Sequence, residues 1–370
     1  MRALAKMPEH RFPTMESFYS ELELAVSGAA MAEDQVSESR AQTSLNLQAY
    51  DAYLRGVHTF DKRTTRGNLR AIEMLERATE LDPRFALAHA ALAGAYIEQF
   101  FSYDPDEEWE EKAFAAIEKA RALDPNLARI YVSKGNLLWT RERRFPHEQT
   151  IAELRRALAI DPNLLDAMNE LGRVLWHIGK VDEAASIYQR MLEIDPSLIN
   201  ARWRFAAVEY CRGNYERSIE LLKMVPRGSM SPTVEGYHAL ALHHLGRTGE
   251  GRAVLDAVDP MHRDDSDFTG VMAIFLVLEG KKAEAEEYIA SAIKQGSQLG
   301  HFHHVEYNIA CARALMDDFD EALAALKRVG EDGFPCYSWF ERDPLLEGLR
   351  DDPRFTELIG QMRARWSGVS

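Results

Sequence analysis

The stretch LDAMNELGRVLWHIGKVDEAASIYQRMLEIDPSL, residues 165–198, decides the fold. It predicts two helices joined by a tight turn. Gly172 allows the two helices to approach closely, and Gly179 can adopt the left-handed conformation in which the first helix ends. Pro196 ends the second helix, because proline has no amide hydrogen and clashes with the preceding turn. The stretch therefore predicts one helical hairpin of 34 residues.

This hairpin recurs along the chain. Its closing turn is repeated as an apolar residue followed by Asp-Pro, with the prolines at Pro83, Pro125, Pro162 and Pro196. Its central turn is repeated with spacings of 34, 33 and 34 residues, at Gly179, Gly213, Gly246 and Gly280. A two-helix unit of 34 residues is the period of tetratricopeptide repeats (TPRs).

Residues 165–198 also resemble the TPR pattern in the types of residue that it contains. The matching positions are Met168, Leu171, Gly172, Leu175, Ala184 and Tyr188. The resemblance implies an all-α fold, a right-handed superhelical solenoid. Looser copies bring the number of TPR-like helical hairpins to about eight between residues 47 and 330, and a C-terminal helical cap follows them.

The sequence divides into four segments. Residues 1–26 resemble the end of a protein-kinase catalytic domain, in which a Pro-x-x-Arg segment precedes a final amphipathic helix; an ordinary capped helix is the alternative. Residues 27–46 are small and polar, which predicts a flexible linker. The TPR solenoid is expected over 47–333 and the cap over 334–370.

Composition excludes several classes of protein. The net charge of −15 argues against a nucleic-acid groove or an anionic membrane surface as a partner. We expect no membrane insertion, because no apolar run approaches the length of a spanning helix, and residues 1–10 lack the apolar core of a signal peptide. Three cysteines are few and odd in number, which fits a reducing compartment. We therefore expect a cytoplasmic protein.

One set of polar and aromatic residues is predicted on the concave face, which the first helix of each hairpin lines. The set is Asn136, Trp139, Asn169, Arg173, Trp176, His177, Asn200, Trp203, Tyr210, His243 and His244. Trp139, Trp176, Tyr210 and His243 occupy equivalent positions in successive hairpins and should form a ladder. Aromatic anchors with amides beside them suit a groove for an extended peptide.

Two interpretations of the ladder remain open. If it is a binding surface, Trp139, Trp176 and Tyr210 should be substantially exposed, and Arg173 could select a carboxylate. If the rings pack between neighbouring hairpins, they should be buried.

Four other patterns resemble catalytic, metal-binding or ligand-binding motifs, and ordinary loops and helix caps explain them more simply. His262-Arg263-Asp264 and Asp267-Phe268-Thr269-Gly270 mimic kinase motifs at the wrong spacing, and a loop with a helix cap accounts for them. The histidines His301, His303, His304, His243 and His244 have no recognisable metal spacing. Residues 246–251 are glycine-rich without a preceding strand, and residues 104–111 are acidic. We predict no catalytic residue, no metal and no cofactor.

The sequence favours a scaffold that binds a protein or peptide and is not an enzyme. Residues 49–56 and the C-terminal cap resemble the TPR regions fused to bacterial serine/threonine kinases and adenylate cyclases. That resemblance implies the sensor or interaction arm of a kinase signalling protein, with a kinase catalytic domain upstream in the parent protein. The alternatives are a regulatory arm that senses a small ligand, and an enzyme with its site in the superhelix groove.

Overall fold

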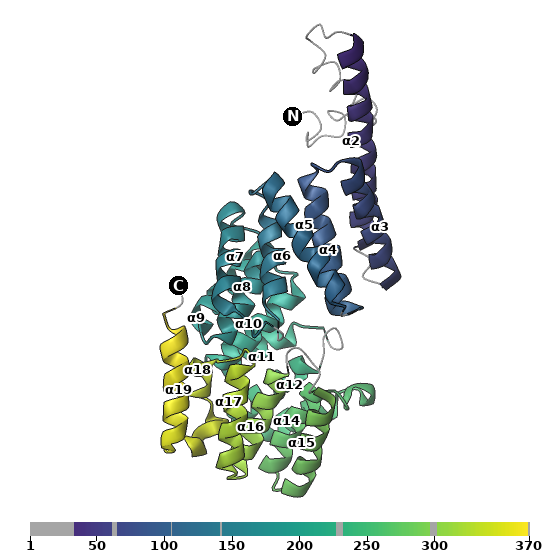
Figure 1. Cartoon of the computed structure of the whole chain (residues 1–370). Helices are drawn as coiled ribbons and strands as arrows, with labels where there is room; N and C mark the ends of the chain where they lie inside the picture. Colours follow the sequence, from purple (N-terminus) through teal and green to yellow (C-terminus); the bar gives the residue numbers. More distant parts are fainter. Residues whose placement is uncertain are drawn as a thin grey trace. The chain divides into compact units, whose positions relative to one another are not determined.

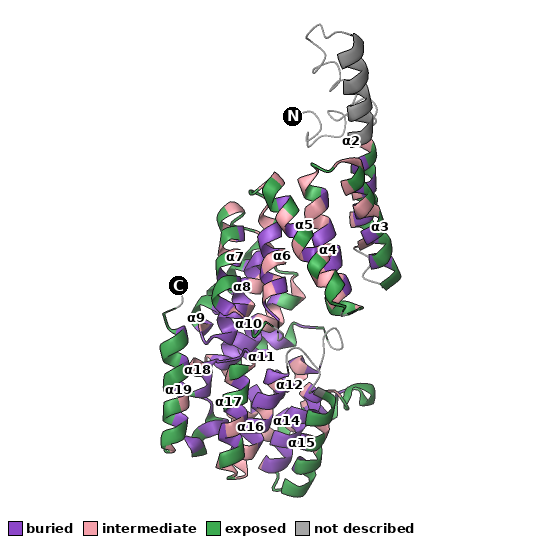
Figure 2. Ribbon diagram, in the orientation of Figure 1, coloured by how far each residue is buried: buried purple, intermediate pink, exposed green. Residues whose placement is uncertain are grey.

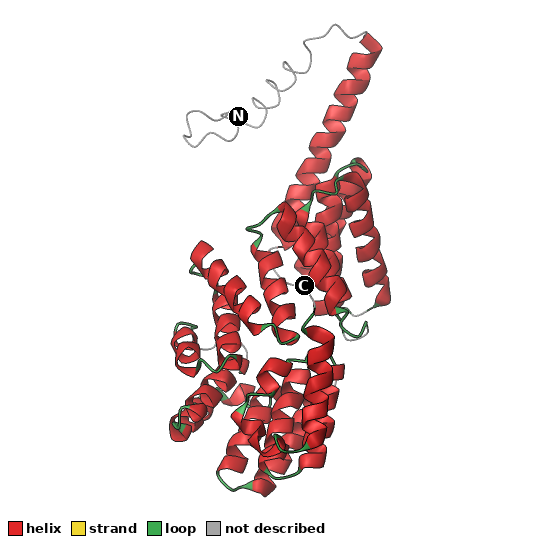
Figure 3. Ribbon diagram, turned by 90° about the vertical axis from the view of Figure 1, so that its left-hand side faces the viewer, coloured by secondary structure: helices red, strands yellow, loops and turns green. Residues whose placement is uncertain are grey.

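The computed structural model describes residues 33–60, 65–104, 106–140, 143–226, 232–296 and 302–368, with side chains from residue 47 onward. Every regular element in these ranges is a helix, as Figure 3 shows. None of these helices is both long enough and apolar enough to cross a bilayer. Contacts group the chain into two compact units, residues 1–104 and 105–370. Each unit is described by itself.

The first unit contains α2 (Glu33–Phe60), α3 (Thr65–Leu81) and α4 (Ala86–Ser102). Small residues of all three helices, Ala52, Ala78 and Ala88, meet in a core against Tyr53 and Phe85. Residues 33–46, the described part of the linker expected over 27–46, are helical instead, because α2 begins at Glu33. Glu, Gln, Arg and Ala in this stretch are good helix formers, and their propensity outweighs the small polar residues that suggested a linker. The kinase-like residues 1–26 lie outside the described residues.

The second unit repeats one motif, a first helix followed by a second helix that packs back on it (Figure 1). It opens with α5 (Glu107–Leu123). The first helices are α6 (Ala128–Leu138), α8 (Leu165–His177), α10 (Ile199–Cys211), α12 (Thr233–His244), α14 (Ser266–Leu278) and α16 (His303–Leu315). Their partners are α7 (His147–Ile160), α9 (Val181–Ile194), α11 (Tyr215–Lys223), α13 (Thr248–Asp256), α15 (Lys282–Gly296) and α17 (Phe319–Glu331). A short 3-10 helix, η3 (Pro260–His262), precedes α14.

The turn chemistry predicted from the repeats is confirmed. The four glycines of the central turns have φ between 75° and 83°, the left-handed region that glycine favours. A Cβ on Gly172 would lie 2.8 Å from Cζ of Tyr188, so glycine is what lets α8 and α9 approach. Seven of the expected eight pairs pack as hairpins in the described residues. Helices α4 and α5, expected as the second pair, fall in different units.

The closing turn uses its aspartate as well as its proline. Asp124, Asp161 and Asp195 each accept a hydrogen bond on Oδ1 from the backbone amide two residues later, over 2.8 to 3.0 Å. An aspartate bonded in this way stabilises a turn and opposes continuation of the helix. The repeated Asp-Pro pair therefore both ends one hairpin and sets the direction of the next.

The C-terminal segment covers the last hairpin, as a cap does, and also contacts hairpins much earlier in the chain. It comprises α18 (Tyr337–Phe340), the 3-10 helix η4 (Pro344–Leu349) and α19 (Pro353–Trp366). The last helix, α19, contacts α17 as expected of a cap. The stretch before it runs back to much earlier hairpins: the Ser338 hydroxyl donates to the Gly179 carbonyl over 2.6 Å, 159 residues away. The C-terminal segment therefore contacts the hairpins that begin with α8 and α10, and we call this contact the closure of the second unit.

Candidate functional site

The predicted ladder lies at the ends of the first helices, and three of its four members are buried. Trp139 directly follows α6, and Trp176 and Tyr210 lie in the last turns of α8 and α10. Their exposed fractions are 4%, 2% and 1%. The exposure that the groove interpretation required of these three rings is therefore absent, and their burial agrees with the packing interpretation.

Part of this burial comes from contacts between neighbouring hairpins. The Trp176 indole N–H donates to Sγ of Cys211 in the next first helix, over 3.3 Å. The hydroxyl of Tyr210 and Nε2 of His244, again one hairpin further on, are 2.9 Å apart and hydrogen-bonded. These links fit the interpretation in which the rings pack between hairpins.

The rest of the burial comes from the C-terminal segment. The Phe334 ring lies 4.9 Å from His177 and 6.0 Å from Trp176, and the Trp339 ring lies 5.6 Å from Tyr210. We call the set of rings that meet here the central aromatic cluster: Trp176, His177, Tyr210, Tyr237, His303, His304, Tyr307, Phe334, Trp339 and Phe340. Figure 2 shows the buried interior of the unit to which it belongs. The place expected for a partner's side chains is filled by this chain's own.

Most of the remaining members of the predicted set lie nearer the surface. Asn136, Asn169, Arg173 and Trp203 are half-buried and Asn200 is exposed; we call these five residues the inner polar row. They lie on the first helices α6, α8 and α10. His243 is also half-buried, and its Nδ1 pairs with the Thr248 hydroxyl over 2.9 Å.

Arg173 is already engaged and does not present a free carboxylate site. Its Nε donates to Glu170 over 2.8 Å, and its guanidinium lies 4.3 Å from the centre of the Trp139 ring. Although burial raises the pKa of the Glu170 carboxyl, the positive charges of Arg173 and Arg204 outweigh it and lower that pKa below its ordinary value. A ligand carboxylate would have to displace Glu170 from this arginine.

The kinase-like and glycine-rich patterns have structural roles. His262 ends η3, and Oδ1 of Asp265 accepts from the Asp267 amide over 2.9 Å, which caps the start of α14. Phe268 lies in the core at 1% exposure. Residues 246–251 form the turn between α12 and α13 and the start of α13. In the acidic stretch, the Asp106 side chain caps α5.

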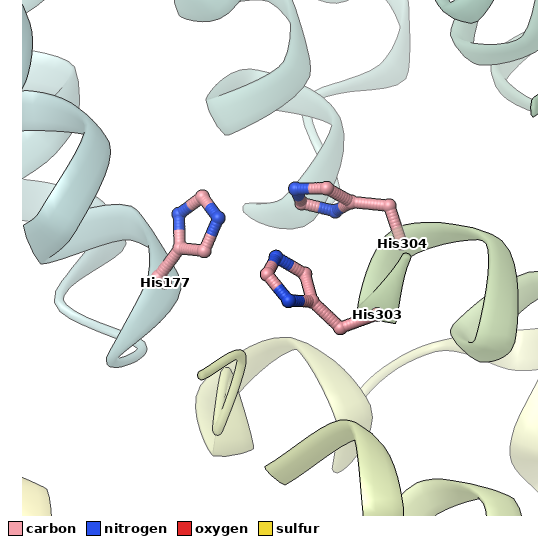
Figure 4. A group of neighbouring side chains, drawn as sticks. All are labelled: His177, His303 and His304. Atoms are coloured by element: carbon pink, nitrogen blue, oxygen red, sulfur yellow. The ribbon is translucent and has the colours of Figure 1, made fainter. Parts of the chain in front are cut away.

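The structure brings together a histidine group that the sequence did not single out. His177 of α8 lies beside His303 and His304 at the start of α16, as Figure 4 shows. The histidines grouped from the sequence separate: His243 and His244 contact each other on α12, and His301 lies outside the described residues. A spacing pattern could not find this group, because α8 and α16 meet only through the closure of the unit.

Buried histidines make the stability of the protein sensitive to acid. His147 is 3% exposed, and burial, helped by the charge of Arg365, lowers its pKa to about 3. Its Nδ1 accepts a hydrogen bond from the Trp139 indole over 2.8 Å, which requires a neutral ring. The unfolded chain takes up this proton near pH 6.5, so stability is complete above that pH and is lost as the pH falls towards 3.

We expect His147→Asn to make the loss of stability below pH 6.5 shallower by up to about 1.4 kcal/mol per pH unit. Urea unfolding at several pH values between 7 and 4.5 measures this slope. His262→Asn is the control, because His262 is exposed. Equal slopes in the His147 variant and the wild type would show that His147 is not held neutral by the fold.

Comparisons with known proteins agree with the repeat architecture. Residues 147–203 match the tetratricopeptide repeat family model. The chain is 31% identical over 109 residues to the TPR repeat-containing protein YpiA of Bacillus subtilis (strain 168), and this match covers 29% of the chain and 26% of that protein. The chain therefore spans about a quarter of that relative's length.

The fold is also similar to that of a solved structure, PilF of Pseudomonas aeruginosa. The TM-score is 0.50 at 19% identity, over 62% of this chain and 98% of that one. At this identity the likeness concerns the fold alone. In the described residues the chain is thus an all-α succession of helical hairpins, of which residues 147–203 match the tetratricopeptide repeat family.

Proposed function

We propose that this chain is a scaffold that binds an extended segment of another protein along the inner polar row, and that it has no catalytic activity of its own. TPR hairpins offer their first helices as such a surface. The central aromatic cluster supports the idea in a second way: it already holds a polypeptide segment, residues 334–343, against the ends of α8 and α10.

One observation carries the proposal. Within the described residues, the indole N–H of Trp203 and the side-chain oxygen of Asn169 are buried and have no hydrogen-bond partner. They lie on successive first helices, in residues that are half-buried. Unpaired buried polar atoms are costly and uncommon. An extended peptide offers carbonyl oxygens and amide hydrogens in alternation, which are the two groups that these atoms lack. Because both atoms are covered in this structure, the two half-buried side chains must turn outward to pair with the peptide.

Charge favours certain partners over others. The net charge of −15 would attract a basic or neutral segment rather than an acidic one. Because Arg173 pairs with Glu170, the row has little free positive charge with which to hold a carboxylate.

The narrower assignment, to the sensor or interaction arm of a bacterial serine/threonine kinase, stays a prediction. It rests on the resemblance of residues 1–26, 49–56 and the C-terminal cap, and residues 1–26 lie outside the described part of the chain. An in-frame kinase catalytic domain encoded directly upstream of Met1 would support it.

Selection from a phage-displayed library of random peptides tests the binding function. We expect enriched peptides to bind the wild type and to bind at least tenfold more weakly to the double variant Asn169→Ala with Trp203→Ala, measured by calorimetry. Arg190→Ala, exposed on the outer helix α9, should bind as the wild type does.

A second variant decides which surface is used. Lys327 is exposed beside a cleft of about 1320 Å³ that is lined mainly by α17 and α19. If Lys327→Ala abolishes binding and the double variant does not, the inner polar row is not the binding surface. If the library yields no specific peptide, the proposal fails.

A further inference from the structure

Three imidazole rings converge at the closure between α8 and α16. The ring centres of His177, His303 and His304 lie 5.3, 5.0 and 4.7 Å from one another. One nitrogen from each ring can be chosen so that the three atoms lie within 4.8 Å of each other. Figure 4 shows a nitrogen of each ring turned towards the space that the rings share. We propose that this histidine triad binds one zinc ion.

Hydrogen bonds prepare two of the rings as ligands. Nδ1 of His177 lies 2.8 Å from the Arg173 carbonyl oxygen, and Nδ1 of His303 lies 2.6 Å from the Asp332 carbonyl oxygen. A carbonyl oxygen can only accept, so each Nδ1 carries the hydrogen and each Nε2 keeps its lone pair. A histidine that donates from one nitrogen to a carbonyl and binds metal with the other is the usual arrangement in zinc sites.

The three ring nitrogens lie slightly farther apart than the ligands of one zinc ion do. Zinc bound tetrahedrally at about 2.0–2.1 Å sets its nitrogen ligands about 3.3 Å apart. The nitrogens must therefore draw together by at most about 1.5 Å from the 4.8 Å that the structure has. Rotation of the side chains can supply this movement. Three nitrogen ligands leave a fourth position for water or another donor.

The surroundings are compatible with a cation. His177 and His303 are 1% and 0% exposed, and the Phe334 ring packs 4.9, 5.6 and 4.5 Å from His177, His303 and His304. Two charged groups face the triad. Arg173 acts against positive charge at His304 but is neutralised by Glu170, while Oδ2 of Asp332 lies 3.9 Å from Nδ1 of His303.

One member of the triad lies nearer the surface than the other two. His304 is partly exposed and borders a cavity of about 20 Å³, which is room for one water molecule. His304 is therefore the ligand at which the triad comes nearest to solvent.

A metal at this point would connect parts of the chain that are far apart in the sequence. His177 ends the first helix of one hairpin, and His303 and His304 begin the first helix of another, four hairpins later. The ion would fasten the closure of the second unit and hold Phe334 in place. The inference is independent of the peptide-binding proposal.

A site with three imidazole ligands and no carboxylate or thiolate favours some metal ions over others. Imidazole suits zinc, copper, nickel and cobalt, whereas calcium and magnesium require oxygen. Zinc is the expected ion because it accepts a tetrahedral site with three histidines and needs no redox partner. Cobalt(II) takes the same geometry and is visible, which makes it a useful probe.

The test uses the full chain without a histidine tag, stripped with a chelator and dialysed against Zn²⁺. We expect about one zinc per chain by elemental analysis and a rise in melting temperature on adding Zn²⁺. Co²⁺ should give the intense visible bands of a tetrahedral complex. His177→Asn and His303→Asn should each weaken zinc binding at least tenfold, while His262→Asn, at an exposed histidine, should bind as the wild type does.

Each outcome decides the proposal. If the wild type, once stripped and dialysed against Zn²⁺, holds no more zinc than the His177 variant, or if Co²⁺ gives only the pale octahedral spectrum, the triad is a packing cluster and the proposal is wrong. Should the variants unfold, the cobalt spectrum and the zinc-dependent melting of the wild type still decide. If Cu²⁺ binds and Zn²⁺ does not, the assignment to zinc is overturned.

Discussion

Phe334→Ala is expected to lower the free energy of unfolding by about 3–5 kcal/mol, the usual cost of emptying a large buried aromatic site. Phe334 is fully buried, and its ring contacts rings from α8, α16 and α18. The cavity would open where the C-terminal segment meets the ladder, among rigid aromatic rings that can fill it only in part. Urea or guanidinium unfolding followed by circular dichroism measures the change.

The same variant tests how the groove is filled. Met261→Ala is the control, because Met261 is 76% exposed and its loss should change stability by less than about 0.5 kcal/mol. If Phe334→Ala costs no more than Met261→Ala, the segment 334–343 is not part of the core. The ladder would then be open to partners in solution, as the exposed-groove interpretation required.

The helical hairpins could be predicted from sequence because their determinants are local. Gly179 and Gly213 mark turns by a backbone preference that the residue itself carries, and the structure has φ of 81° and 83° at these positions. Pro162 and Pro196 act through their own missing amide hydrogen. Each signal operates within a few residues, so a single sequence suffices to find it.

The state of the ladder could not be predicted, because it depends on a distant segment. The register correctly placed Trp176 and Tyr210 in equivalent turns of α8 and α10. The residues near Trp176 and Tyr210 in the sequence do not indicate that Phe334 and Trp339 cover these two rings. The C-terminal segment has the amphipathic pattern of a cap, and that pattern does not say which surface the segment covers.

The histidine triad was missed for the same reason. Metal motifs are recognised by ligands at short, fixed spacings on one helix or loop. Here one ligand ends α8 and two begin α16, and they meet only because the second unit closes on itself. The three histidines can therefore be recognised as a group only from the three-dimensional structure, not from a sequence motif.

Gly251→Ala is expected to lower the free energy of unfolding by about 3 kcal/mol, the upper end for overpacking a core. A Cβ at this position would lie 2.5 Å from the Ala239 carbonyl oxygen and 3.0 Å from Cζ of Phe275. The nearer atom belongs to the backbone of α12, which cannot rotate away. Helices α12 and α13 would have to separate, and thermal or urea unfolding would report the loss.

Gly249 provides a matched control on the same helix. In the described part of the chain, a Cβ at Gly249 would have no neighbour within 4 Å. Because alanine favours a helix over glycine, Gly249→Ala should raise stability by about 0.5–1 kcal/mol. Opposite signs for the two variants would show that the glycines of residues 246–251 serve different needs, a close helix contact at Gly251 and none at Gly249. A phosphate-binding loop would need both for the approach of a ligand; equal effects of the two substitutions would contradict the packing explanation.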